Sequence, residues 1–104
     1  MENLNDQNFE EVILNAGKPV VVDFWAEWCP PCKKLGPVLE KVSEEYKDKV
    51  LFCKVNVDEN PILGGTFKID VIPTVILFKG EEATSFFVGY KEEGEIKEWI
   101  NNNI

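Results

Sequence analysis

Two cysteines separated by two prolines, Cys29 and Cys32, are the residues of this 104-residue chain best suited to chemistry. An apolar run, Val20 to Phe24, precedes them, and an amphipathic stretch from Lys33 to Tyr46 follows. This order predicts a strand, a short loop and a helix. Pro30 suits the first helical turn, because its missing N–H has no partner there and its φ is already helical. We therefore expect Cys29 at the helix start, where free N–H groups and the helix dipole favour a thiolate.

The same placement predicts a different role for each of the two cysteines. Cys32 comes one helical turn after Cys29 and on the same side, within reach of a disulfide. The thiolate is the attacking species in thiol–disulfide exchange. We predict that Cys29, at the helix start and nearer to solvent, attacks a substrate disulfide. Cys32 then resolves the mixed disulfide.

A metal site is the main alternative for a Cys-x-x-Cys pair, and the number of ligands argues against it. Zinc sites take four ligands, usually Cys and His, whereas this chain has one further cysteine and no histidine. That cysteine, Cys53, lies in a segment of alternating apolar residues and is predicted to be a core residue without a catalytic role. We therefore expect a redox dithiol with no metal and no bound cofactor.

The elements that must position the dithiol can be placed by periodicity and turn residues. We predict an edge strand at residues 1–4, a helix capped by Asp6 and running to about Asn15, strands at 20–25, 50–58, 75–78 and 83–88, and helices at 33–46, 60–67 and after Gly94. The early alternation predicts parallel strands, and the final strand–turn–strand predicts an antiparallel hairpin. The expected fold is one α/β domain over residues 1–104, with a mixed central sheet flanked by helices on both faces.

The charge balance limits the classes of partner. The chain has 19 Asp and Glu against 11 Lys, with a net charge of −8. Nucleic acids and anionic membranes are bound through basic surfaces, so we expect neither as a partner. The sequence shows no basic start followed by an apolar leader and no apolar run long enough to cross a bilayer, which predicts a cytoplasmic protein. For an acidic domain of this size we expect a monomer.

The sequence as a whole resembles the thioredoxin family. The resemblance is carried by Asp23-Phe24-Trp25-Ala26-Glu27-Trp28-Cys29, by Pro31-Cys32-Lys33 and by Ile72-Pro73-Thr74, which match in order and spacing. It extends from about Leu4 to Ile104. The resemblance implies the thioredoxin fold and the reduction of protein disulfides through a reversible Cys29–Cys32 disulfide. It also implies recycling by a thioredoxin reductase.

Two charged residues gain a role from this resemblance. Asp23 interrupts the apolar run, so we expect its carboxyl group to be buried and its pKa to be raised. The matching acid of the family transfers a proton to and from the second cysteine. Lys54 matches a family lysine that lies near this acid, which implies that it modulates Asp23.

The resemblance also implies a substrate-binding surface around the dithiol. Trp28 would supply an exposed aromatic surface, whereas Trp25 is expected to pack partly in the core. The family places a cis proline at Pro73, and the backbone of Ile72 could pair with a substrate strand. Gly89 matches a glycine that lines the substrate groove, where the lack of a side chain permits close approach.

Pro30 departs from the family pattern, because most thioredoxins have glycine at this position. Proline removes an N–H that could point at the Cys29 sulfur, and it stiffens the loop. We include Pro30 and Pro31 in the predicted substrate-binding surface. The favoured activity is a general protein-disulfide reductase; the alternative is a thiol oxidant or disulfide isomerase on the same fold. A binding module without catalysis is a third hypothesis.

Overall fold

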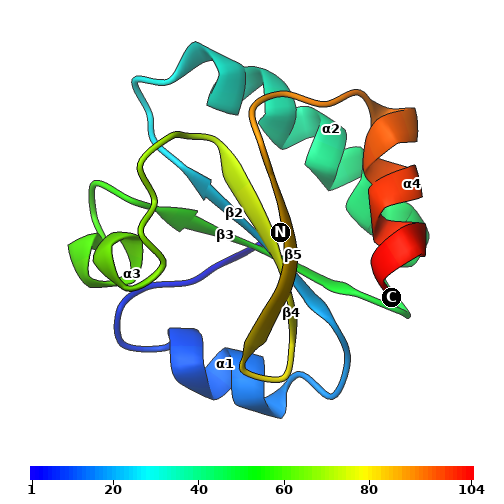
Figure 1. Cartoon of the computed structure of the whole chain (residues 1–104), viewed down its shortest axis with the longest axis horizontal. Helices are drawn as coiled ribbons and strands as arrows, with labels where there is room; N and C mark the ends of the chain where they lie inside the picture. Colours follow the sequence, from blue (N-terminus) through cyan, green and yellow to red (C-terminus); the bar gives the residue numbers. More distant parts are fainter.

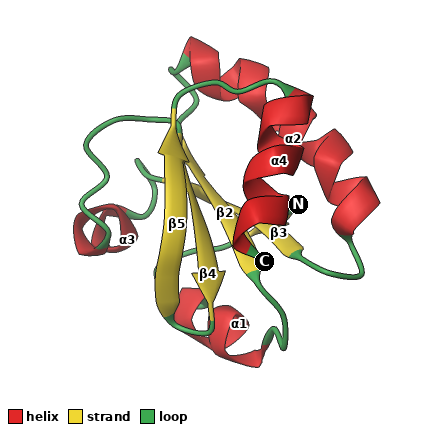
Figure 2. Ribbon diagram, turned by 45° about the vertical axis from the view of Figure 1, so that its right-hand side comes forward, coloured by secondary structure: helices red, strands yellow, loops and turns green.

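The computed structural model describes all 104 residues and shows a five-stranded sheet between two pairs of helices (Figures 1 and 2). The strands are β1 (Glu2–Asn3), β2 (Val20–Trp25), β3 (Leu51–Asn56), β4 (Thr74–Lys79) and β5 (Glu82–Val88). The helices are α1 (Phe9–Asn15), α2 (Pro30–Tyr46), α3 (Pro61–Thr66) and α4 (Glu93–Asn103). The predicted mixed α/β fold is confirmed.

Strand β2 lies at the centre of the sheet, whose order is β1-β3-β2-β4-β5. Strands β1, β3 and β2 run parallel, and β4 is antiparallel to both of its neighbours. The residues of β2 are buried except for the half-buried Trp25, as expected for a strand that is covered on both faces. Because the cysteine loop follows β2 directly, the dithiol is attached to a strand that is hydrogen-bonded along both edges.

The side chains of the sheet alternate between two hydrophobic cores. Val22 of β2 packs on the side of α1 and α3, and Val21 packs on the side of α2 and α4. The same alternation was predicted for residues 50–58 and is confirmed, since Cys53 joins the first core and Phe52 the second. Figure 1 shows α2 and α4 together on one side of the sheet, with α1 and α3 on the other.

The start of the first helix differs from the prediction. Helix α1 begins at Phe9 with Asn8 as its N-cap, and Asp6 does not cap it. Instead, Asp6 Oδ1 accepts a hydrogen bond of 2.9 Å from the Leu63 N–H, and Oδ2 accepts one of 3.4 Å from the Ile62 N–H. These donors belong to the first turn of α3, where N–H groups lack partners inside the helix. Asp6 therefore ties α3 to the N-terminal segment.

Candidate active site

Cys29 and Cys32 form a disulfide at the start of α2, with 5.2 Å between their Cα atoms. As predicted, Cys29 is the N-cap of this helix and Pro30 follows at its first position. An N-cap side chain accepts from the N–H of the second or third helical residue. The second is Pro31, which has no N–H, and the third is Cys32, whose N–H lies 3.3 Å from Cys29 Sγ. A single N-cap donor is therefore held on the sulfur of Cys29.

The exposure of the two cysteines corrects one part of the prediction. Cys29 is 3% exposed and Cys32 is 2% exposed, so Cys29 does not lie markedly nearer to solvent. What distinguishes them is their electrostatic setting: Cys29 occupies the positive end of α2, and Cys32 lies one turn inside the helix. Pro30 and Pro31, between them, are both exposed.

The loop that leads into β4 lies against the dithiol. Its Ile72–Pro73 peptide bond is cis, as the family resemblance implied. The carbonyl oxygen of Ile72 lies 3.7 Å from Cys29 Sγ. This is a packing contact in the oxidised protein, because a disulfide sulfur carries no proton to donate. The contact places the Ile72 backbone beside the sulfur of Cys29.

Gly89 adjoins the same loop from the end of β5. Its N–H donates a hydrogen bond of 2.8 Å to the carbonyl oxygen of Pro73. Its φ is +86°, a backbone conformation that favours glycine. A Cβ at this position would meet no atom of the chain within 4 Å. The backbone conformation, and not crowding within the chain, therefore accounts for glycine here.

A cavity of about 420 Å³ behind the dithiol is lined by Asp23, Lys54 and Cys32, among others. Asp23 of β2 and Lys54 of β3 are partners in the strand register. The Lys54 ammonium group lies over the ring of Trp25, 5.2 Å from the ring centroid. The structure thus brings the predicted acid, the predicted lysine and the second cysteine to one cavity.

Burial sets the protonation of Asp23. Its side chain is 2% exposed and its Oδ1 has no hydrogen-bond partner. Loss of hydration disfavours the charged carboxylate and raises the pKa of Asp23 from 3.8 to about 7, although the positive charge of Lys54 opposes the shift. The predicted burial and raised pKa are confirmed. An acid with a pKa near 7 can both take up and release a proton at neutral pH.

Trp28 stands at the rim of the site and is 67% exposed, as predicted. Its indole Nε1–H donates a hydrogen bond of 2.7 Å to Asp58 Oδ2. The backbone N–H of Asp58 in turn donates to Asn56 Oδ1 at 2.9 Å. Sequence reasoning missed Asp58, which lies 30 residues from Trp28. No local pattern in the sequence points to Asp58, because the contact depends on β3 lying beside β2.

Cys53 behaves as the core residue that was predicted. It is 1% exposed and packs between the sheet and the helices α1 and α3. Burial raises the pKa of its thiol to about 12, with a smaller effect from the negative charge of Glu2, so the thiol stays neutral.

In the structure, His, Cys, Asp and Glu side chains form no group of three or more that could hold a metal ion. None of the helices has the length and apolar character needed to cross a membrane.

A disulfide-forming pair at a helix N-terminus, with a buried acid behind it, defines a thiol–disulfide oxidoreductase. The thioredoxin family model matches residues 1–102 of this chain. The thioredoxin of Rickettsia bellii (strain RML369-C) is 47% identical over 102 residues, which cover 98% of this chain and 97% of that protein. The chain belongs to the thioredoxin family. It is a protein-disulfide oxidoreductase that acts by thiol–disulfide exchange.

Two further relatives agree with this assignment. The thioredoxin of Buchnera aphidicola subsp. Acyrthosiphon pisum (strain APS) is 46% identical over 101 residues, covering 97% of this chain and 94% of that protein. The thioredoxin of Chlorobaculum thiosulfatiphilum is 42% identical over 99 residues, covering 95% and 92% of the two chains. Similarity over almost the whole of each chain extends the family assignment from the motif to the fold.

Proposed function

We propose that this chain is a general cytoplasmic protein-disulfide reductase that acts as a monomeric single domain over residues 1–104. It carries electrons from a thioredoxin reductase to proteins that contain disulfides. The net charge of −8 supports partners other than nucleic acid or anionic membranes. The observation that carries the proposal is the single N–H held on Cys29 Sγ at the start of α2.

The reaction begins at the N-cap of α2. The thiolate of Cys29 attacks one sulfur of a substrate disulfide, so that a mixed disulfide forms and the other substrate sulfur leaves as a thiolate. Cys32 then loses its proton and attacks Cys29 Sγ, which releases the second substrate thiolate. The substrate gains two electrons, and the chain is left with the Cys29–Cys32 disulfide. A thioredoxin reductase returns the two electrons.

Asp23 takes the proton of Cys32 during the second step. The shared cavity and a pKa of about 7 support this role, because proton transfer is efficient when the pKa of the acceptor lies near the working pH. Lys54 modulates Asp23, since its charge favours the ionised carboxylate that accepts the proton.

Substrate proteins bind over the rim of the dithiol. Trp28, Pro30 and Pro31 form one side of this rim and are exposed. Ile72, Pro73 and Gly89 form the other side, where the Ile72 carbonyl lies beside Cys29 Sγ. An extended substrate segment can pair with the backbone at Ile72.

A trapping experiment tests the order of the two cysteines. In the Cys32→Ser variant the second step is blocked, so substrate proteins should accumulate as mixed disulfides on Cys29. Cys29→Ser should trap none in this way, and Cys53→Ser should behave as the wild type. Recovery of no mixed disulfides on Cys29 would reject the mechanism.

The redox potential tests the direction of the reaction. A dithiol becomes a strong oxidant when its reduced form is stabilised, and Pro31, which has no N–H, leaves Cys29 Sγ with one N-cap donor, the Cys32 N–H. Weak stabilisation of the thiolate favours a reductant. Fluorescence of Trp25 and Trp28 in graded dithiol buffers would give the potential. A value at the oxidising end of the scale would support the thiol oxidant or disulfide isomerase instead.

A further inference from the structure

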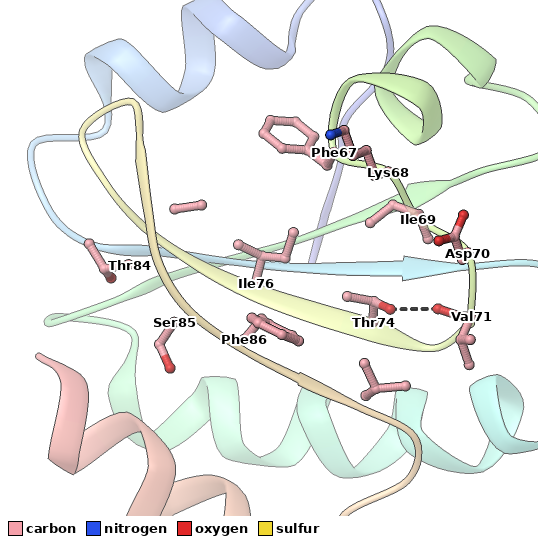
Figure 3. Close-up of a pocket in the computed structure, with 12 residues that line it drawn as sticks. Phe67, Lys68, Ile69, Asp70, Val71, Thr74, Ile76, Thr84, Ser85 and Phe86 are labelled. Carbon is pink, nitrogen blue, oxygen red and sulfur yellow. Dashed lines mark hydrogen bonds between the residues drawn. The ribbon is translucent and has the colours of Figure 1, made fainter.

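A second cavity lies along the β4–β5 hairpin, outside the dithiol cavity. It has a volume of about 550 Å³. It runs from Val71 and Thr74, at the start of β4, to Thr84 of β5 (Figure 3). We refer to it as the hairpin groove. The proposed mechanism does not use it.

Exposed apolar side chains line the hairpin groove. Phe86 is 65% exposed, Val71 57% and Val88 46%. In the register of β4 and β5, Phe86 lies opposite Ile76 and Val88 lies opposite Thr74.

The position of Ile76 identifies the face of the sheet on which the hairpin groove lies. It packs in the core beneath α1 and α3. Phe86 therefore stands on the same face, at the edge that the two helices do not cover. Contiguous exposed apolar residues commonly mark a binding surface.

The hairpin groove meets the reactive centre at one end. Val71 directly precedes Ile72, whose carbonyl oxygen lies 3.7 Å from Cys29 Sγ. Val88 directly precedes Gly89, whose N–H is bonded to the Pro73 carbonyl. A substrate sulfur that reaches Cys29 can therefore place a neighbouring residue at the mouth of the groove.

The dimensions suit a short extended segment. A strand advances about 3.3 Å per residue, so the step from Val88 to Phe86 corresponds to two substrate residues. Strand β5 is an edge of the sheet, so its outer backbone groups are open to pairing with an added strand.

A second copy of this chain is a less suitable occupant of the groove than a substrate segment, because two chains with a net charge of −8 repel each other.

We propose that the hairpin groove binds an apolar side chain in the extended segment that flanks the reactive cysteine of a protein-disulfide substrate, with Phe86 as its principal contact. The proposal rests on the proposed function, because it takes Cys29 as the point at which the substrate disulfide arrives. The groove thereby selects substrates by the residues beside their cysteine.

The test compares synthetic peptides that carry one cysteine as a mixed disulfide with a chromogenic aromatic thiol. Attack by the reduced protein on the peptide sulfur forms one S–S bond and breaks one, and it releases the coloured thiolate. A single Leu is moved through about four positions on either side of the cysteine in a Ser background, a range that covers the reach of the groove. The rate constant of release is measured for each peptide.

We expect one Leu position, or two that are two residues apart, to react about 5- to 30-fold faster than the all-Ser peptide, the range typical of one buried anchor. Phe86→Thr should abolish the preference and leave the all-Ser peptide and a small aromatic disulfide unchanged. Ile62→Thr is the matched control, because Ile62 is 68% exposed on α3 and does not line the groove. Val71→Ser gives a second test should Phe86→Thr unfold the protein.

Three results would overturn the proposal. The first is equal rates for all peptides, and the second is a Leu preference that survives in both Phe86→Thr and Val71→Ser. The third is a dimer in sedimentation that dissociates on Phe86→Thr, which would assign the groove to a second copy. If the small disulfide is not reduced either, the proposed function itself fails, and the groove proposal falls with it.

Discussion

Asp23 and Lys54 face each other across the β2–β3 register, and both line the cavity that reaches Cys32. The lysine is the nearby charge that lowers the pKa of Asp23, against the larger effect of burial. The two residues can therefore be substituted separately. Asp23→Asn should remove the titration of the carboxyl group, whereas Lys54→Met should raise its pKa further.

Asp23→Asn should slow resolution of the mixed disulfide. The wild-type rate should rise with pH through about 7, as Asp23 ionises and becomes able to accept the Cys32 proton. In the variant this rise should vanish, and the rate above pH 7 should fall by about 10- to 100-fold. Stopped-flow fluorescence gives the rate, with the exposed Asp48→Asn as control. An unchanged pH profile would exclude Asp23 from proton transfer.

The same substitution should stabilise the oxidised protein at neutral and alkaline pH. The folded pKa of Asp23 lies above the unfolded value of 3.8, so the folded state holds the proton more tightly. The stability that this proton contributes is therefore fully present below about pH 4, is lost as the pH rises to about 7, and is absent above it. Asp23→Asn removes this decrease, with an upper bound of about 4 kcal/mol above pH 7. Urea unfolding measures it, and equal stability at alkaline pH would contradict the burial penalty.

Lys54→Met should shift the pH profile toward alkaline values. Removal of the ammonium group takes away the charge that favours the ionised carboxylate, so the pKa of Asp23 should rise further above about 7. The midpoint of the resolution rate should move with it, while the rate at high pH recovers. Lys49→Met, at an exposed position, is the matched control. A midpoint that stays in place would show that Lys54 does not act on Asp23.

Asp58→Ala should weaken binding of protein substrates without altering the dithiol. Loss of the 2.7 Å hydrogen bond frees the Trp28 indole, which then has to be ordered when a substrate binds. We expect KM for a protein disulfide to rise about 3- to 10-fold, the effect of losing about 1 kcal/mol. Reduction of a small disulfide should be unchanged. The neighbouring Glu59→Ala serves as control, and equal effects of the two variants would argue against a role for the bond.

Asp6→Ala should destabilise the protein by about 1 kcal/mol, because two N–H groups at the start of α3 lose their acceptor. Glu10→Ala, in the first turn of α1, should change stability by less than about 0.5 kcal/mol. Hydrogen exchange should quicken in α3 but not in α1. Faster exchange confined to α1 would return Asp6 to the role predicted from sequence.

The hydrogen-bond partners of Asp6 could not be predicted from the sequence. Its position ahead of an apolar periodic stretch predicted a local N-cap, whereas the donors it serves lie 56 and 57 residues away. The partner of Trp28 at Asp58 was missed for the same reason. Both contacts depend on which strands are neighbours, and local patterns carry little of that information.

Other features could be predicted because their causes are local. The placement of Cys29 as N-cap follows from Pro30, and the burial of Asp23 follows from the apolar residues around it. The exposure of Cys29 could not be predicted in this way, because it depends on the Ile72 loop folding over the sulfur. Alternation likewise places Phe86 on one face of β5 but does not tell whether a helix covers that face.

The two prolines between the cysteines have a consequence for spectroscopy. Neither has an amide proton, so the segment between the sulfurs gives no signal in amide-detected NMR spectra. The Cys32 amide, 3.3 Å from Cys29 Sγ, is then the one proton of the N-cap hydrogen bond that such spectra detect. Its chemical shift should follow the oxidation state of the sulfur that it contacts, which gives a single-nucleus readout of electron flow through the protein.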